Sequence, residues 1–331
     1  MRILLGVILG AAILWSGYWY IGAMRTENGL RDWLDQRDHA GWVANYGEVD
    51  TRGFPNRFDS TITDIELADP ATGIAWSAPF FQIFQLSYQP SHVIAIWAAE
   101  QSLATPLQKI TTTTDSAQGS LVFVPRSNLF LDRASLVFEQ INLTSTADWS
   151  ASLDSALLAT RGSGPNTHDI VVELKSLSPK GGTLAKLAET GLVPGVIDSL
   201  KIDATLSFDA PWDRTAIETR RPQPTAIKLK LLQANWGQLD LWAAGDLSVD
   251  DQGRASGEIT LKAKNWREML DLAHQAGWVP DPLLPSIESG LKLVAGMSGS
   301  PKTLDAPLTF KDGVVSFGPF PIGTAPRLTL R

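Results

Sequence analysis

The chain has 331 residues, of which 44% are hydrophobic and 19% charged, enough for one large domain or two ordinary ones. Its 28 basic and 35 acidic residues give a net charge of −7. This argues against a nucleic-acid partner, because contacts to phosphates need clustered Lys and Arg. No cysteine is present, which excludes disulfides, thiolate catalysis and cysteine-ligated metal sites.

The first predicted element is an apolar helix. From Ile3 to Met24 the chain carries no charged side chain, and Arg2 and Arg25 bracket the run. At a helical rise of about 1.5 Å per residue the run is roughly 33 Å long, which is enough to cross a bilayer core of about 30 Å.

The far end of this run favours an anchor over a cleaved signal peptide. Signal peptides have a shorter apolar core and small residues before the cleavage site, whereas Ile21 stands where a small residue is expected. Aromatic rings with a polar edge are typical of the membrane interface, and four of them lie here: Trp15, Tyr18, Trp19 and Tyr20. We therefore predict an uncleaved anchor over residues 1–25, with a cleaved signal as the alternative.

Orientation follows from the short basic N-terminus, which favours export of all that comes after it. Arg25, Arg31 and Arg37 on the other side weaken this argument. For a bacterial chain the prediction is an inner-membrane protein with its soluble part in the periplasm. Residues 26–48 are predicted to form a separate juxtamembrane helix, capped by Thr26, which lies along the membrane or packs on the domain.

From Val49 onward the pattern changes to period two, which indicates half-buried antiparallel strands. In the segment 202–209, Ile, Ala, Leu and Phe alternate with Asp, Thr, Ser and Asp. Similar alternation marks 170–177, 227–231, 239–244, 258–263 and 308–311. Gly253 and Gly313 are expected in hairpin turns. Short helices are expected over 182–191, after an Asn265 cap and within 282–295, where a strand is expected to follow the helix.

These elements predict a mainly β (α+β) fold, an extended, twisted antiparallel sheet or open sandwich with short helices and one N-terminal transmembrane helix. The proposed division is 1–25 anchor, 26–48 juxtamembrane helix, 49–160 N-terminal β region and 161–331 C-terminal β region. One continuous domain over both β regions is the alternative.

No catalytic constellation is found. The four histidines (His39, His92, His168 and His274) are widely separated and lack metal-binding spacing. His168 and Asp169 are adjacent on a predicted strand, where successive side chains point to opposite faces, and both are expected to be surface residues. We predict no catalytic, cofactor-binding or metal site, no cofactor and no enzymatic activity.

Two segments resemble a known family. Residues 53–58 (GFPNRF), Gly73, Trp76, Ala78-Pro79, Tyr88, Pro90 and Trp97, together with 312–326, are similar to the signatures of an uncharacterised bacterial membrane-anchored family, domain-of-unknown-function family 2125. That family has no assigned activity, so the resemblance implies no functional residue.

A second likeness concerns residues 237–261 and the helix that follows, which resemble AsmA-like envelope proteins. These carry an apolar sheet groove thought to bind phospholipid, and such a groove needs no catalytic residue. The resemblance leads us to expect lipid binding or transfer, with Phe58, Phe80, Phe81, Phe84 and Trp97 as groove residues or, alternatively, core. A structural or assembly factor that binds other envelope proteins is the alternative function.

Overall fold

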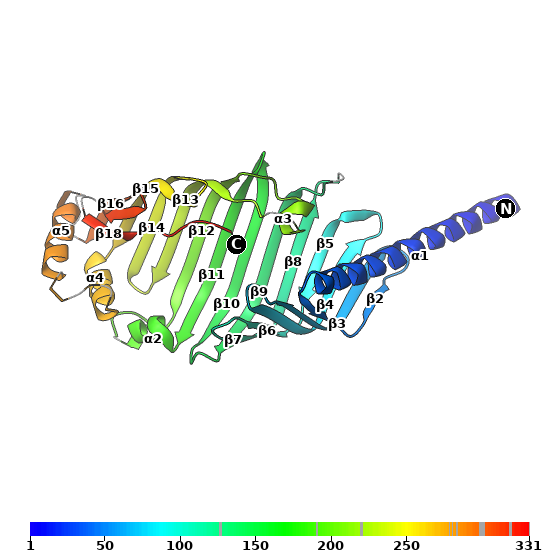
Figure 1. Ribbon diagram of the computed structural model, residues 1–331, viewed down its shortest axis with the longest axis horizontal. Coiled ribbons are helices and arrows are strands. Elements are labelled where there is room, and N and C mark those ends of the chain that lie inside the picture. The colour runs from blue at the N-terminus through cyan, green and yellow to red at the C-terminus, as the bar shows by residue number, and fades with distance from the viewer. Residues whose placement is uncertain are drawn as a thin grey trace. The chain divides into compact units, whose positions relative to one another are not determined.

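A computed structural model of the protein describes residues 1–125, 128–189, 191–218, 221–277, 279, 281–282, 284–297, 302–317 and 320–330. These residues form eighteen strands and five helices, and the strands pair antiparallel (Figure 1). The predicted mainly β fold with an N-terminal apolar helix is confirmed. The chain divides into two compact units, residues 1–125 with 136–147 and residues 126–135 with 148–331.

Unit 1 contains the long helix and the first strands. Its elements are α1 (Arg2–His39), β1 (Val43–Asn45), β2 (Val49–Arg52), β3 (Arg57–Asp69), β4 (Ile74–Leu86), β5 (Gln89–Trp97), β6 (Glu100–Ala104), β7 (Lys109–Thr113) and β8 (Ser116–Phe123). Strand β9 (Leu131–Ser145) contributes residues to both units. Strand β3 pairs with β4 along its length, with β2 near its start and with β1 near its end.

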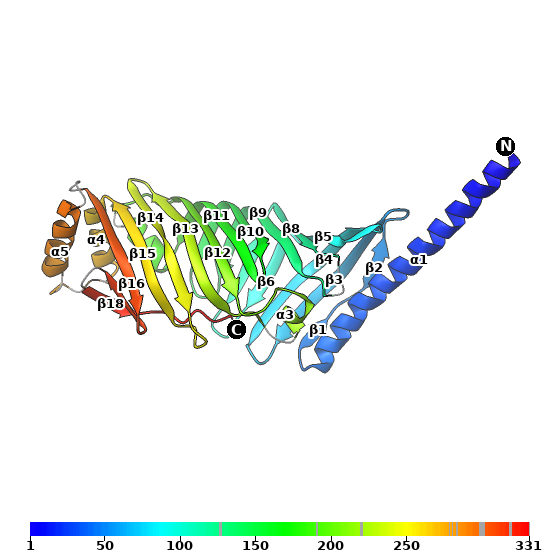
Figure 2. The ribbon, with the colours of Figure 1, turned by 90° about the horizontal axis from the view of Figure 1, so that it is seen from above.

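Helix α1 is unbroken from the apolar run into the charged segment that follows. Thr26 does not cap a new helix, because its hydroxyl donates a hydrogen bond to the Gly22 carbonyl 3.0 Å away. The helix ends at His39, before Gly41 at φ +90°, so residues 43–45 of the segment expected to be helical form β1. Figure 2 shows the first half of α1 projecting beyond the strands of unit 1 and its second half lying beside β1 and β2.

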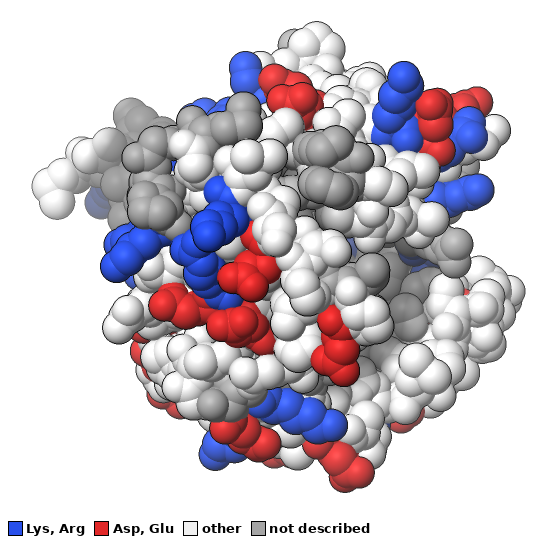
Figure 3. Space-filling view, turned by 90° about the vertical axis from the view of Figure 1, so that its left-hand side faces the viewer, with Lys and Arg blue, Asp and Glu red and all other residues white. Residues whose placement is uncertain are grey.

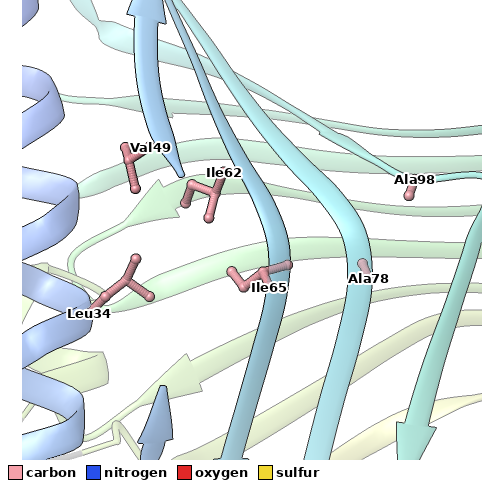
Figure 4. Close-up of a cluster of buried hydrophobic side chains, with 6 residues drawn as sticks. All are labelled: Leu34, Val49, Ile62, Ile65, Ala78 and Ala98. Atoms are coloured by element: carbon pink, nitrogen blue, oxygen red, sulfur yellow. The ribbon is translucent and has the colours of Figure 1, made fainter. Parts of the chain in front are cut away.

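The second half of α1 covers the core of unit 1. Leu34 is buried against side chains from β2, β3 and β4 (Figure 4). The buried cluster consists of Leu34, Val49, Ile62, Ile65, Ala78 and Ala98. Removing this apolar surface from water holds the helix on the sheet.

Unit 2 is a run of long neighbouring strands with four short helices. Its elements are β10 (Ser150–Gly164), β11 (Thr167–Lys180), α2 (Gly182–Glu189), β12 (Ile197–Phe208), α3 (Arg214–Glu218), β13 (Pro224–Trp236), β14 (Leu239–Val249), β15 (Ala255–Lys264), α4 (Trp266–Gln275), α5 (Leu284–Met297), β16 (Thr303–Lys311), β17 (Val314–Phe317) and β18 (Phe320–Thr324). Each strand pairs with the next in sequence. Strand β10 crosses the boundary that the sequence pattern suggests at residue 160.

The predicted turns and helices of this unit are confirmed with two corrections. The strand expected after the helix within 282–295 is absent, because α5 stays helical from Leu284 to Met297, and the other correction concerns Asn265. Gly253 and Gly313 both adopt φ +76° in their hairpins. Helix α4 ends before Gly277, also at φ +76°. Asn265 occupies the N-cap position of α4, but its amide donates to the Gln238 carbonyl at 2.7 Å and caps no helical N–H.

Candidate functional site: an apolar sheet face in unit 2

The strands of unit 2 place apolar side chains in rows that run across the sheet. The first apolar row has one residue directly opposite the next on strands β10 to β16: Ala156, Leu174, Leu200, Ala234, Leu241, Ala263 and Leu304. The second apolar row is Leu158, Val172, Ile202, Leu232, Ala243, Leu261 and Ala306. Because alternate residues of a strand share a face, the two rows together make one continuous apolar surface.

Between these rows, the intervening residues face the other side of the sheet and are mostly polar. Glu173, Lys201, Gln233, Trp242, Lys262 and Asp305 lie directly opposite one another on β11 to β16. The Lys201 ammonium lies 2.6 Å from the Glu173 carboxylate. One face is therefore built for water and the other for apolar contact.

A further polar cluster on this side surrounds Asp169. Its carboxylate accepts hydrogen bonds from Lys230 at 2.8 Å and Thr205 at 2.6 Å, and Arg161 lies 3.5 Å away. Hydrogen bonds from Lys230 and then Thr205 lower the pKa of Asp169 from 3.8 to about 2. The cluster keeps this carboxylate ionised at neutral pH.

Helices α2 and α4 cover part of the apolar face and form with it a partly open cavity of about 450 Å³, within the size range of small-molecule sites. Its lining comes from β11, α2, β12, β13, β14 and α4: Leu174, Leu177, Leu187, Ile197, Leu200, Ala234, Trp236, Leu239, Leu241, Met269, Leu272 and Ala273. Every lining residue is apolar. Figure 1 shows α2, α4 and α5 gathered around one end of the unit.

Two apolar clusters hold the covering helices in place. Trp266 and Leu270 of α4 are buried with Ala295 of α5 against β15 and β16. Leu187 of α2 and Leu272 of α4 are buried with Leu239 of β14. Helices with one apolar stripe are stable only where such a stripe is buried, so the sheet face and its cover stabilise each other.

One local irregularity brings a second residue of β11 into the cavity. Ser176 adopts φ +56°, outside the extended β region, so the alternation of side chains is interrupted there although β11 keeps its register with β10 and β12. As a result Leu174 and Leu177, three residues apart, both line the cavity.

His168 lies on the apolar side of β11 and is only 6% exposed, so the expectation of a surface residue is wrong for it. Its Nδ1 lies 3.3 Å from the Thr160 hydroxyl, and its ring meets Phe208 edge-on at 6.3 Å. Burial lowers the pKa of His168, against a weaker opposing effect of Asp169. A neutral imidazole suits this apolar surrounding.

The five aromatic residues predicted for a groove all lie in unit 1. Phe58 is buried on β3, and Phe81 lies between Trp76 and Trp97 at ring distances of 5.9 and 5.3 Å. Phe80 packs at the margin of the unit 1 core. Phe84 of β4 lies directly opposite Asp59 of β3, on the face of the sheet away from Phe58. The Arg57 guanidinium lies over its ring at 5.5 Å. Their contact with lipid stays a prediction.

Phe84 also lines a hollow of about 450 Å³ on unit 1, and this hollow differs from the cavity of unit 2. Its other lining residues are polar: Glu48, Asp50, Arg52, Asp59, Thr61, Thr63 and Gln82. Two spaces of the same volume therefore differ in chemistry, and only that of unit 2 suits an apolar ligand.

The predicted interface aromatics lie where α1 first meets its own unit. Trp15 and Trp19 donate indole hydrogen bonds of 2.8 Å to the carbonyls of Pro55 and Arg57, and Tyr18 donates one of 2.6 Å to that of Ser87. Tyr20 remains 62% exposed. Among the described residues, α1 is the helix long and apolar enough to span a membrane.

The surface charge at this end of unit 2 is of mixed sign. On the face in Figure 3, at the α5 end of unit 2, Lys and Arg side chains are interspersed with Asp and Glu. Such a mixed surface is typical of soluble domains and does not mark a polyanion site.

Comparison with known proteins places the chain in a family. A model described as "Uncharacterized protein conserved in bacteria (DUF2125)" matches residues 19–326. No curated protein and no solved structure matches the chain, so the resemblance to AsmA-like proteins has no match behind it. The matched residues run from Trp19 in α1 to the end of unit 2 beyond its last strand, and the chain therefore belongs to the bacterial DUF2125 family.

Proposed function

We propose that this protein is a non-enzymatic, inner-membrane-anchored protein of the cell envelope that binds the acyl chains of phospholipid on the apolar face of unit 2. The observation that carries the proposal is the cavity of about 450 Å³ with a wholly apolar lining. Each buried methylene contributes about 0.8 kcal/mol, so an acyl chain needs no polar partner inside the cavity.

The half-buried residues of the second apolar row support the same function. Val172, Ile202, Leu232 and Leu261 lie beyond the lining of the cavity and retain access to solvent. Exposed contiguous apolar surface is uncommon on soluble domains and marks binding sites. The cavity would hold part of a chain, and the row would carry the remainder.

The anchor is proposed to be retained, with Met1 and Arg2 on the cytoplasmic side and both units in the periplasm. Support comes from the hydrogen bonds of Trp15, Tyr18 and Trp19 to unit 1, which a cleaved chain would lose. The intact mass of the protein purified from bacterial membranes tests this. We expect the mass of a chain that begins at Met1. The mass of a chain that begins after Ala23 would contradict the retained anchor.

Photo-crosslinking in living bacteria tests lipid binding in the full chain. Benzoylphenylalanine is introduced at Met269, which lines the cavity, or at Asp271, which lies on the exposed side of the same helix. Irradiation should attach radiolabelled phospholipid at position 269 and not at 271.

A blocking variant completes the experiment. Ala234→Phe places a ring in the cavity from β13 and should abolish the adduct at position 269, whereas Gln233→Phe, on the polar face, should leave it. Equal adducts at 269 and 271, or an adduct unaffected by Ala234→Phe, would contradict a specific cavity. Absence of lipid adducts at 269 would favour the alternative, an envelope assembly factor that binds proteins.

A further inference from the structure

Two hairpin tips of unit 1 meet α1 at the level of its interfacial aromatics. The β2–β3 loop supplies the Pro55 carbonyl to the indole of Trp15, and Arg57 at the start of β3 supplies its carbonyl to the indole of Trp19. The β4–β5 turn supplies the Ser87 carbonyl to the Tyr18 hydroxyl. The tips are also joined to each other, because the Ser87 N–H donates to the Asn56 carbonyl at 2.9 Å.

This arrangement leaves large apolar side chains facing outward. Phe54 is 57% exposed and Tyr88 is 62% exposed, at the tips of their hairpins. Trp15 is 41% and Tyr18 49% exposed on the adjacent turn of α1. We name these four residues, with the exposed Pro55, the membrane collar.

The length of the helix decides what covers the membrane collar. From Ile3 to Tyr18 the helix spans about 23 Å, whereas a hydrocarbon core is about 30 Å thick. A bilayer that begins at Arg2 therefore reaches beyond Tyr18, and the hairpin tips bonded to Trp15 and Tyr18 lie within it.

The charges around the loop are already paired. Arg52 and Arg57 flank the β2–β3 loop, and their guanidinium groups form ion pairs with Asp50 and Asp59. Paired arginines exert little attraction on anionic lipid. The contact is therefore expected to depend on apolar and aromatic insertion and not on headgroup charge.

We propose that the membrane collar inserts into the outer headgroup boundary of the same bilayer that α1 spans, so that unit 1 is seated on the membrane at a fixed depth. The proposal rests on the retained anchor proposed above. It does not depend on lipid binding in unit 2.

The natural absence of cysteine allows a direct depth measurement on the full chain in phosphatidylcholine vesicles. Single variants Phe54→Cys and Tyr88→Cys are labelled with a bimane fluorophore and quenched by lipids spin-labelled near the headgroup or deep in the acyl chain. Both positions should be quenched at least about twofold more by the shallow label than by aqueous iodide, because interfacial side chains lie 5–10 Å into the boundary.

Two controls separate the proposal from its premise. Leu107 is also exposed, at 91%, but its neighbour Pro106 packs on Gly73, beyond the other end of β3. That end lies roughly 40 Å along the strand from Arg57. A bimane label on Leu107→Cys should therefore be quenched by iodide alone. Ile8→Cys, within the apolar run, should respond to the deep label.

Deep quenching at position 8 with iodide quenching at 54 and 88 would overturn the membrane collar and leave the anchor intact. If the deep label also fails to quench the fluorophore at position 8, the anchor itself would be overturned. Vesicles with added phosphatidylglycerol should give the same depths, and insertion that requires the anionic lipid would overturn the uncharged contact. Unchanged thermal unfolding of each variant confirms that the labelled chains are folded.

Discussion

At the residue scale, His168 couples the apolar face to pH. Its imidazole is buried on that face, and burial lowers its pKa below the ordinary value of 6.5. In the unfolded chain the same group binds a proton at about pH 6.5, so the unfolded state holds more protons below that pH. The free energy of unfolding should therefore fall as the pH drops below about 6.5.

His168→Gln removes this proton-binding group and should flatten the pH dependence. We expect the loss of melting temperature between pH 7.5 and pH 5 to be smaller in the variant than in the natural chain, measured by tryptophan fluorescence in detergent. Parallel pH curves for the two proteins would show that His168 carries no part of the dependence.

Asp169 offers a second test on the polar side of the same strand. Lys230 is the largest cause of its pKa of about 2, so Lys230→Met should raise that pKa toward 3.8, as followed by carboxyl chemical shifts in a pH titration. Lys201→Met, which removes the partner of Glu173 instead, should leave the titration of Asp169 unchanged. A shift of equal size in both variants would contradict the assigned pairing.

At the element scale, the crossing of α1 over β3 depends on one small residue. A Cβ at Gly22 would overlap the ring of Phe58, whereas a Cβ at Gly17 would have nothing within 4 Å. Phe58 is 5% exposed and rests against Trp19 at 6.1 Å, which leaves the ring little room to move. Gly22 thus permits the close approach of helix and sheet.

Gly22→Val should therefore loosen this contact, with a cost of about 1–3 kcal/mol, as overpacking typically has. The measurement is thermal unfolding of the detergent-solubilised chain, with proteolysis between α1 and β1 as a second readout. Gly17→Val makes the same change in helix propensity without the overlap and should behave like the natural chain. Equal destabilisation by both variants would place the effect in the helix and not in its contact.

The elements that local pattern predicts are those whose cause is local. Alternation in residues 202–209 predicts β12, and Gly253 predicts its hairpin, because side-chain period and positive φ depend on few neighbours. Thr26 matches the pattern of a residue that begins a new helix, but the helical spacing continues through it, and its hydroxyl donates a hydrogen bond to the Gly22 carbonyl instead. The Asn265 side chain likewise does not cap its helix, because its amide donates a hydrogen bond to the carbonyl of Gln238, which is distant in sequence.

At the scale of the whole molecule, the class of fold and the long apolar N-terminal helix were predictable, but the cavity was not. Its lining joins Leu174, Trp236 and Met269, which register and helix packing bring together from distant parts of the chain. The aromatic residues that the sequence suggests for a groove all lie in unit 1. The cavity is lined mainly by aliphatic residues that alternate in ordinary strands, and only the alignment of apolar positions from strand to strand signals it.

The alignment of the first apolar row also bears on how a bound chain would travel. Adjacent strands lie about 4.8 Å apart, so the row from β10 to β16 extends about 29 Å, roughly twice the thickness of one leaflet. An acyl chain laid across the strands would meet Ala or Leu at every step from β10 to β14. At β15 and β16 the row ends beneath α4 and α5, because Ala263 and Leu304 are buried there. If lipid binds here as proposed, a chain would therefore stay on apolar side chains as it shifts from strand to strand along the uncovered part of the row, until the covering helices stop it.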